Sequence, residues 1–296
     1  MSPHMLLMFL SILVLGTMIT LSSSHWILAW MGLEINTFAI IPLMIQKNHP
    51  RALEATLKYF IIQSTAAIML LFSSTLNAWL SGQWDIQHMI HPLPLTVMIM
   101  ALALKMGLAP VHAWYPEILQ GLDFKVGLLI STWQKLAPLV LFIQISKDYS
   151  MLYSSLGLIS VLVGGWGGLN QTQLRKILAY SSIAHLGWIV LVAHYFPAIS
   201  LLAFLMYTMM AFSLFFTFNY LSSNSINSLT ISWTKSTILI STMPLTLFSL
   251  GGLPPFTGFM SKWLILNELT KQGLLLLATI TALSALLSLF FYLRLS

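Results

Sequence analysis

Long apolar runs, separated by short polar or proline-containing links, make up nearly the whole chain. Each run is close to the ~20 apolar residues that a helix needs to cross the hydrocarbon layer of a membrane. No run has the alternating pattern of a membrane β-strand. We therefore predict an all-α polytopic membrane protein with about ten transmembrane helices, near residues 3–23, 25–45, 56–80, 93–121, 126–146, 149–171, 174–195, 197–222, 236–270 and 273–295.

The fourth and ninth runs carry the same interruption by glycine and proline. Such residues leave backbone groups that hydrocarbon cannot satisfy, so a break persists only where protein or a water-filled cavity supplies partners. Discontinuous helices at matching places in two halves of a chain are typical of transport sites. The residues that predict the breaks are Gly107 and Pro110 in the fourth run, and Gly252, Pro254 and Pro255 in the ninth.

About five helices in each half predict an inverted repeat, residues 1–146 and 147–296, because an odd number makes the second half enter the membrane from the opposite side. Basic residues give an independent indication of orientation, since they favour the side on which the chain was made. Lys147 and Lys271 are expected on the far side. Those expected on the side of the N-terminus are Lys47, Arg51, Lys58, Lys125, Arg175, Lys176, Lys235 and Arg294.

Composition excludes several classes of protein. With 58% hydrophobic and 7% charged residues, the chain has too few polar side chains to cover a soluble globule. The net charge of +6 does not indicate a nucleic-acid partner, because the basic residues form no patch. The absence of cysteine excludes disulfides, thiolate zinc sites and cysteine-ligated iron-sulfur clusters. No dinucleotide-binding or Walker motif is present, so we expect no cofactor on this chain.

Four ionisable residues are predicted to lie inside the membrane: Glu34, Lys105, Lys135 and Lys262. Each such residue costs about 2.5–3.5 kcal/mol at mid-membrane on insertion scales. Burial disfavours the ammonium form of a lysine, whereas a nearby carboxylate favours it. A lysine beside a movable carboxylate can therefore take up and release a proton. We interpret the four residues as a proton path, with water between the lysines.

Two histidines could relay protons along this path, because imidazole titrates near neutral pH. His112 lies two residues after Pro110, and His185 lies within the seventh run. Hydrogen-bonded packing explains each of them equally well. The charged residues also have a structural alternative, in which the lysines extend to the membrane surface or Glu34 forms a static pair with one of them. No histidine has the spacing of a metal ligand, so we predict no metal site.

Four long segments have distinctive sequences, Lys105 to Glu117, Trp133 to Pro138, Gly167 to Gly187 and Gly251 to Trp263. Together with Ser23 to Glu34, they resemble the chain 2 family of mitochondrial NADH:ubiquinone oxidoreductase, the antiporter-like membrane subunits of respiratory complex I. The resemblance covers essentially the whole chain. Members of the family continue past Ser296 into a further helix, so we expect this chain to be truncated there.

The resemblance implies a subunit of H⁺-translocating NADH:ubiquinone reductase that has no redox site of its own. NADH, FMN, iron-sulfur clusters and ubiquinone would bind to partner subunits, and this chain would move protons. Its partners would be the other membrane-arm subunits of complex I and the lipid of the mitochondrial inner membrane, with the N-terminus in the matrix. Glu34 and Lys105 would be the charge pair of one half-channel, Lys135 the connecting lysine, and Lys262 the lysine of the second half-channel.

Two other functions remain open. The chain could be a structural scaffold of the same complex, in which case its interior should be dry. It could also be an independent cation/proton antiporter, but a hard cation needs several oxygen ligands. Glu34 is the only carboxylate that we expect inside the membrane, and three lysines would repel the ion.

Overall fold

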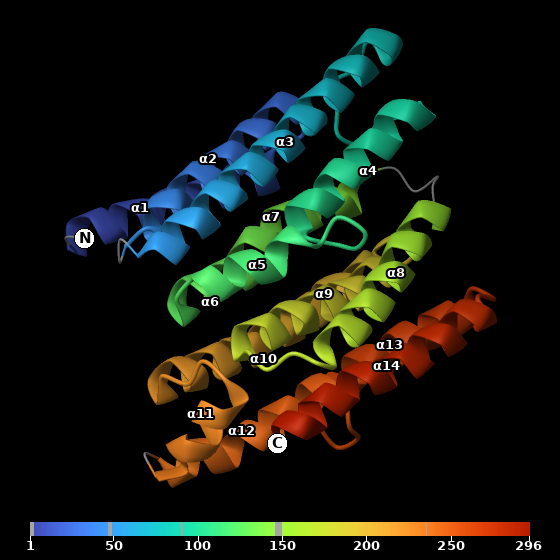
Figure 1. Cartoon of the computed structure of the whole chain (residues 1–296). Coiled ribbons are helices and arrows are strands. Elements are labelled where there is room, and N and C mark those ends of the chain that lie inside the picture. Colours follow the sequence, from blue (N-terminus) through green and yellow to red (C-terminus); the bar gives the residue numbers. More distant parts are fainter. Residues whose placement is uncertain (1–2, 47–48, 90, 146–149, 235) are drawn as a thin grey trace. The chain divides into compact units, whose positions relative to one another are not determined.

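The computed structural model describes residues 3–46, 49–89, 91–145, 150–234 and 236–296. Within these ranges all regular secondary-structure elements are helices. β-type pairing is limited to two isolated bridges, one between His25 and Asp85 and one between Gln173 and Ser225. Figure 1 labels the helices. They are α1 (Pro3–Ser22), α2 (Trp26–Met44), α3 (Pro50–Ser81), α4 (Pro92–Met106), α5 (Trp114–Gly121), α6 (Phe124–Ser131), α7 (Trp133–Gln144), α8 (Ser150–Gly168), α9 (Leu174–Ala193), α10 (Pro197–Leu221), α11 (Ile226–Ile231), the 3-10 turn η1 (Ser232–Thr234), α12 (Thr237–Gly251), α13 (Thr257–Lys271) and α14 (Leu275–Leu295).

Most of these helices can cross a membrane. In the described part of the chain, eight helical stretches are long and apolar enough to do so, and α4 and α12 are shorter apolar helices. These elements correspond to the predicted runs, so the prediction of an all-α polytopic membrane protein is confirmed. The third helix begins at Pro50, earlier than the expected residue 56. Proline suits the first turn of a helix, and His49 Nδ1 accepts a hydrogen bond from Arg51 N at 3.2 Å.

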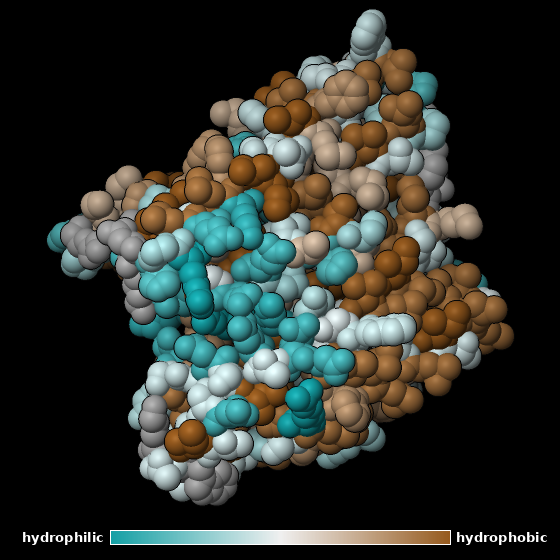
Figure 2. All heavy atoms as spheres, in the orientation of Figure 1, coloured by the Kyte–Doolittle hydropathy of each residue, from teal (hydrophilic) through white to brown (hydrophobic). Residues whose placement is uncertain are grey.

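The outer faces of the helices carry large apolar side chains, drawn in brown in Figure 2. On α3, for example, Ile68 is 69% exposed and Leu57 is 63% exposed. Apolar surface of this extent is unfavourable in water but matches the hydrocarbon layer of a membrane.

Two membrane helices end at glycine, as predicted. Gly107 closes α4 with φ 75° and ψ 40°, and Gly252 closes α12 with φ 79° and ψ 39°. In each case the glycine N–H donates to carbonyl oxygens of the preceding turn, Ala103 and Leu104 in α4 and Phe248 and Ser249 in α12. Only glycine adopts this left-handed conformation without a steric cost. The matching geometry explains why both runs are interrupted at this point.

A third interruption, between α6 and α7, was not expected, since residues 126–146 were predicted as one helix. Ser131 Oγ and Thr132 Oγ1 both donate to the carbonyl oxygen of Leu128, at 2.9 and 2.8 Å. Hydroxyl groups that bond back to the preceding turn bend membrane helices. The break occurs at Thr132, with φ −115° and ψ −69°, and places Lys135 in the first turn of α7.

The helices pack as two compact units. The first comprises Met1–Gly107 and Gly121–Tyr149, and the second comprises Leu108–Gln120 and Ser150–Ser296. The division after Tyr149 lies near the expected boundary of the two repeats, but α5 and the turn before it belong to the second unit. The inverted relation between the two halves stays a prediction.

Within the first unit, α1 packs along α2, and α3 packs on α2 and α4. Within the second unit, α8 and α9 form the most extensive helix pair, because glycines let their backbones approach. A Cβ added at Gly164 would lie only 2.6 Å from Ala184 N and 2.9 Å from Ala184 Cα. Close approach through small residues is the usual way in which membrane helices associate.

The contact at Gly164 predicts that one added methyl group will strongly destabilise the protein. Gly164→Ala should force α9 away from α8 and lower the free energy of unfolding by about 1–3 kcal/mol, as overpacked cores do. The matched control is Gly251→Ala, whose Cβ would meet its nearest neighbour at an ordinary 3.7 Å. Thermal unfolding in detergent measures both. Equal midpoints for the two variants would contradict the close contact of α8 and α9.

Candidate functional site

The carboxylate of Glu34 and the ammonium of Lys105 form an ion pair inside the first unit. Glu34 lies on α2 and Lys105 lies in the last turn of α4, with 3.7 Å between Lys105 Nζ and Glu34 Oε1. This distance suits an ion pair but is longer than a hydrogen bond. The Lys105 side chain is 2% exposed and the Glu34 side chain is 17% exposed. The amine is therefore the more deeply buried partner.

Glu34 has a second polar neighbour besides Lys105. Thr37 Oγ1 donates to the Glu34 carbonyl oxygen at 2.8 Å and, at a longer 3.3 Å, to Glu34 Oε2. Tyr59, a buried residue of α3, lies close enough to interact with the carboxylate electrostatically. Glu34 can thus rotate away from Lys105 without losing all of its polar contacts.

Lys135 is buried in the same unit, with 2% of its surface exposed. It lies on α7, which packs against α4, α1 and α2. The neighbouring Gln134 anchors this turn of α7 to α2, because its Nε2 donates to the carbonyl oxygen of Asn36 at 3.2 Å. Asn36 lies two residues after Glu34. The segments that carry Glu34, Lys105 and Lys135 are therefore packed in one unit.

Lys262 in the second unit lies at the end of α12. It extends from α13, and its Nζ donates to the carbonyl oxygens of Gly251 at 2.9 Å and Leu250 at 3.3 Å. The last carbonyls of a helix carry partial negative charge and have no partner within the helix. Nζ also lies 6.0 Å from the centroid of the Trp188 ring, within range of a cation–π interaction. The break at Gly252 thus forms part of the binding site for this ammonium.

A cavity of about 300 Å³ adjoins Lys262. Its walls are apolar apart from the lysine and nearby backbone, and include Trp188, Phe259, Trp263 and Leu286. Trp263 and Leu286 are exposed on the outside of the unit. Lys262 itself is buried, but the cavity connects it to the surface of the unit.

The two candidate relay histidines also lie in the second unit. His185 Nε2 lies 3.5 Å from the hydroxyl of Tyr292, and the His185 ring packs on Tyr207 at 5.3 Å between centroids. His112 Nδ1 lies 3.2 Å from the carbonyl oxygen of Pro110. Both the relay and the packing interpretation stay open on these contacts.

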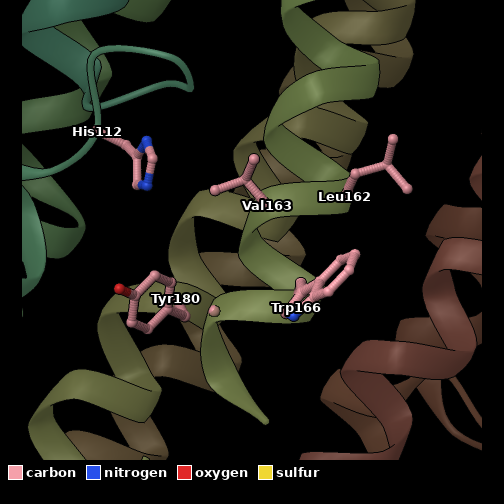
Figure 3. Close-up of a pocket in the computed structure, with 6 residues that line it drawn as sticks. His112, Leu162, Val163, Trp166 and Tyr180 are labelled. Carbon is pink, nitrogen blue, oxygen red and sulfur yellow. The ribbon is translucent and has the colours of Figure 1, made fainter. Parts of the chain in front are cut away.

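His112 borders a second cavity, of about 310 Å³. Figure 3 shows the imidazole and the phenol ring of Tyr180 at its wall, opposite the apolar side chains of α8. The cavity is half-open and offers few polar atoms. Its lining residues are His112, Leu162, Val163, Trp166, Gly167 and Tyr180.

Of the predicted site residues, the structure brings Glu34 and Lys105 into contact. Lys135 shares their unit, whereas Lys262 belongs to the second unit. Their roles in proton transfer stay predictions. Of the basic residues used to infer orientation, Lys47, Lys147 and Lys235 lie outside the described residues.

Glu268 is a second acidic residue that helix packing buries, besides the partly buried Glu34. Glu268 lies in the last turn of α13 and is buried, with a side chain that is 11% exposed. Its Oε1 accepts a hydrogen bond from Lys271 Nζ at 2.7 Å. The only signal in the sequence was that residue 268 falls within the predicted run 236–270.

Within the ranges that the structure describes, no three or more histidine, aspartate or glutamate side chains gather as a metal ion would require. The first unit holds the carboxylate–amine pair and one further buried amine, Lys135, and the second unit holds the buried amine of Lys262 and the buried carboxylate of Glu268. Groups of this kind bind and transfer protons.

Membrane helices broken inside the apolar layer, with a buried lysine at each break, define a polytopic membrane protein of the transporter class. Residues 23–288 match the family model described as NADH:quinone oxidoreductase/Mrp antiporter, TM. The chain belongs to this family. The structure is similar to a chain of respiratory complex I from Thermus thermophilus, with a TM-score of 0.87, 27% identity, and coverage of 96% of this chain and 67% of that one.

Two curated relatives are each 62% identical over 296 residues, which is 100% of this chain and 85% of theirs. They come from Tetraodon nigroviridis and Salmo salar, and both are named NADH-ubiquinone oxidoreductase chain 2. A chain of the Mrp complex from Dietzia sp. shares the fold, with a TM-score of 0.84 at 17% identity, over 97% of this chain and 59% of that one.

The contact between Gly252 and Lys262 predicts a coupling that a double-mutant cycle can measure. A Cβ at Gly252 would lie 2.9 Å from Lys262 Cδ and 3.1 Å from Nζ, whereas one at Gly273, with φ 75°, would meet nothing within 4 Å. In both alanine variants the left-handed conformation should lower the free energy of unfolding by about 1–2 kcal/mol. Gly252→Ala should lower it by about 1.5–3 kcal/mol more, because the added methyl group displaces the Lys262 ammonium from its carbonyl acceptors.

Thermal unfolding of the three single variants, Gly252→Ala, Gly273→Ala and Lys262→Ala, and of the two double variants that combine Lys262→Ala with either glycine change tests this coupling. In a Lys262→Ala background, Gly252→Ala and Gly273→Ala should become equally destabilising. If the difference between them persists without the lysine, the proposed contact is not its cause.

Proposed function

We propose that this chain is a proton-translocating, antiporter-like subunit of the membrane arm of respiratory complex I, located in the mitochondrial inner membrane with its N-terminus in the matrix. Electron transfer from NADH to ubiquinone, with its FMN and iron-sulfur clusters, would take place on partner subunits. The observation that supports this function best is the buried pair of Glu34 and Lys105 at the end of a broken membrane helix, in a chain whose curated relatives are subunits of this enzyme.

The geometry of the pair suits a proton switch. While Glu34 lies near Lys105, its negative charge stabilises the ammonium. The pair has no direct hydrogen bond to break, since Lys105 Nζ and Glu34 Oε1 are 3.7 Å apart, and Thr37 offers the carboxylate another partner. When Glu34 moves away, the ammonium in its buried site loses its counter-charge and can release a proton.

From Lys105 the proton would pass to Lys135 and then to Lys262. Neighbouring helix axes lie about 8–10 Å apart, so water must bridge the amines. Moving one charge against a potential of about 150–200 mV costs roughly 3.5–4.6 kcal/mol. A switch between paired and unpaired states of a buried amine can supply a free-energy change of this size. His112 and His185 are the candidate relays.

An independent cation antiporter fits the site less well. The partly buried carboxylate of Glu34 and the buried carboxylate of Glu268 each already lie within ion-pair distance of a lysine. A hard cation would have to displace these ammonium groups and find further oxygen ligands. A scaffold role predicts that the buried charges can be removed without loss of pumping.

Replacing Glu34 with glutamine tests the proposed function. Glu34→Gln keeps the size of the side chain but removes the charge that controls Lys105. A proton-transferring group contributes about 10²–10⁴-fold to its step, so the rate of NADH-driven proton pumping in the assembled enzyme should fall at least ~10-fold. Glu54→Gln is the matched control, because Glu54 is 65% exposed and pairs with Lys58 on the surface of α3. Pumping at the wild-type rate in Glu34→Gln would favour the scaffold.

A further inference from the structure

Glu268 is a buried carboxylate in α13 that the path through Glu34 and the lysines does not use. The buried face of α13 consists of Gly258, Ser261, Lys262, Ile265, Glu268 and Leu269. Lys262 and Glu268 therefore both lie on the buried side of one helix. Glu268 follows Lys262 by six positions, which corresponds to about 9 Å along the axis.

The two oxygens of Glu268 have different surroundings. Oε1 accepts from Lys271 Nζ at 2.7 Å, and the Lys271 side chain is 59% exposed. Oε2 is buried, and no group in the described residues donates a hydrogen bond to it. The carboxylate thus lies between the exposed ammonium of Lys271 at the end of α13 and the buried interior of the unit. Its Oε2 is available to bind a proton or to accept a hydrogen bond from a water molecule.

Helix stability does not account for this residue. A negative charge in the last turn of a helix interacts unfavourably with the helix dipole, and burial of a carboxylate has a further desolvation cost that one ion pair often fails to offset. The exposed pair of Glu54 and Lys58 has a similar Nζ–Oε1 distance of 2.9 Å without this cost. Ionisable residues retained in membrane helices at such a cost usually serve transport.

We propose that Glu268 transfers protons between Lys262 and the aqueous phase at the C-terminal end of α13. The proposal rests on the proposed function and adds a residue to it. An N–H bond of the Lys262 ammonium breaks, and its proton passes through water to Glu268 Oε2, leaving a neutral amine and a neutral carboxylic acid. The acid then releases the proton to bulk water. The restored carboxylate stays paired with Lys271, and Lys262 is recharged from Lys135.

The test uses the assembled complex in sealed vesicles, with Glu268→Gln in this chain. The amide preserves the size of the side chain but takes up no proton, so we expect the rate of NADH-driven proton pumping to fall at least ~10-fold. Glu268→Asp should restore much of it, because the carboxyl group returns. Glu54→Gln, which removes an exposed carboxylate from a similar Glu–Lys pair, should leave pumping unchanged.

Lys262→Met separates failure of this inference from failure of the proposed function. If Lys262→Met loses pumping and Glu268→Gln does not, Glu268 is not the transfer group and the proposed function stands. Wild-type pumping in both variants would overturn both proposals. A loss in Glu54→Gln as large as that in Glu268→Gln would also overturn the inference, since burial would then be irrelevant.

If Glu268→Gln prevents assembly, Glu268→Cys provides a second test, because the chain contains no other cysteine. Carboxymethylation with iodoacetate restores a carboxyl group at this position, whereas iodoacetamide adds a neutral amide of similar size. Recovery of pumping with iodoacetate alone, compared with identically treated wild-type complex, is expected. Equal effects of the two reagents would contradict the proposal.

Discussion

Hydrocarbon offers no hydrogen bonds, so every backbone group that a membrane helix leaves free must find a partner within the protein. The two broken helices meet this requirement in the same way, with a glycine N–H that bonds back to the last turn of α4 or α12. At α12 the remaining carbonyls accept from Lys262. The requirement for donors at a helix end thus explains how the amine of Lys262 can be buried within the protein.

The same constraint shapes the charge pairs. An ammonium buried among apolar helices needs oxygen atoms nearby, and the protein supplies a carboxylate for Lys105 and helix-end carbonyls for Lys262. The Glu34–Lys105 contact is the looser of the two, at 3.7 Å against 2.9 Å for Lys262 and Gly251. A loose pair costs little to separate, which suits the switching role proposed for Glu34.

Much of this arrangement was predictable from particular residues. Gly107 and Gly252 predicted where two helices break, because a left-handed turn favours glycine wherever it occurs. The break at Thr132 was missed, since a threonine is common within helices and only its bond to Leu128 shows that it ends one. Glu268 was missed because burial near the end of a run depends on neighbouring helices that the local sequence does not specify. The assignment of α5 to the second unit could not be predicted from the sequence either, because it depends on tertiary packing alone.

The sequence by itself determined the class of the protein, the approximate places of its helices and the ionisable residues inside them, because hydrophobicity and backbone preference are local properties of the chain. Only the tertiary structure decided which of those charges meet. The Glu34–Lys105 contact joins residues on α2 and α4, and the bonds of Lys262 join α13 to α12. Such contacts depend on how helices far apart in sequence pack and rotate, and no local pattern encodes that.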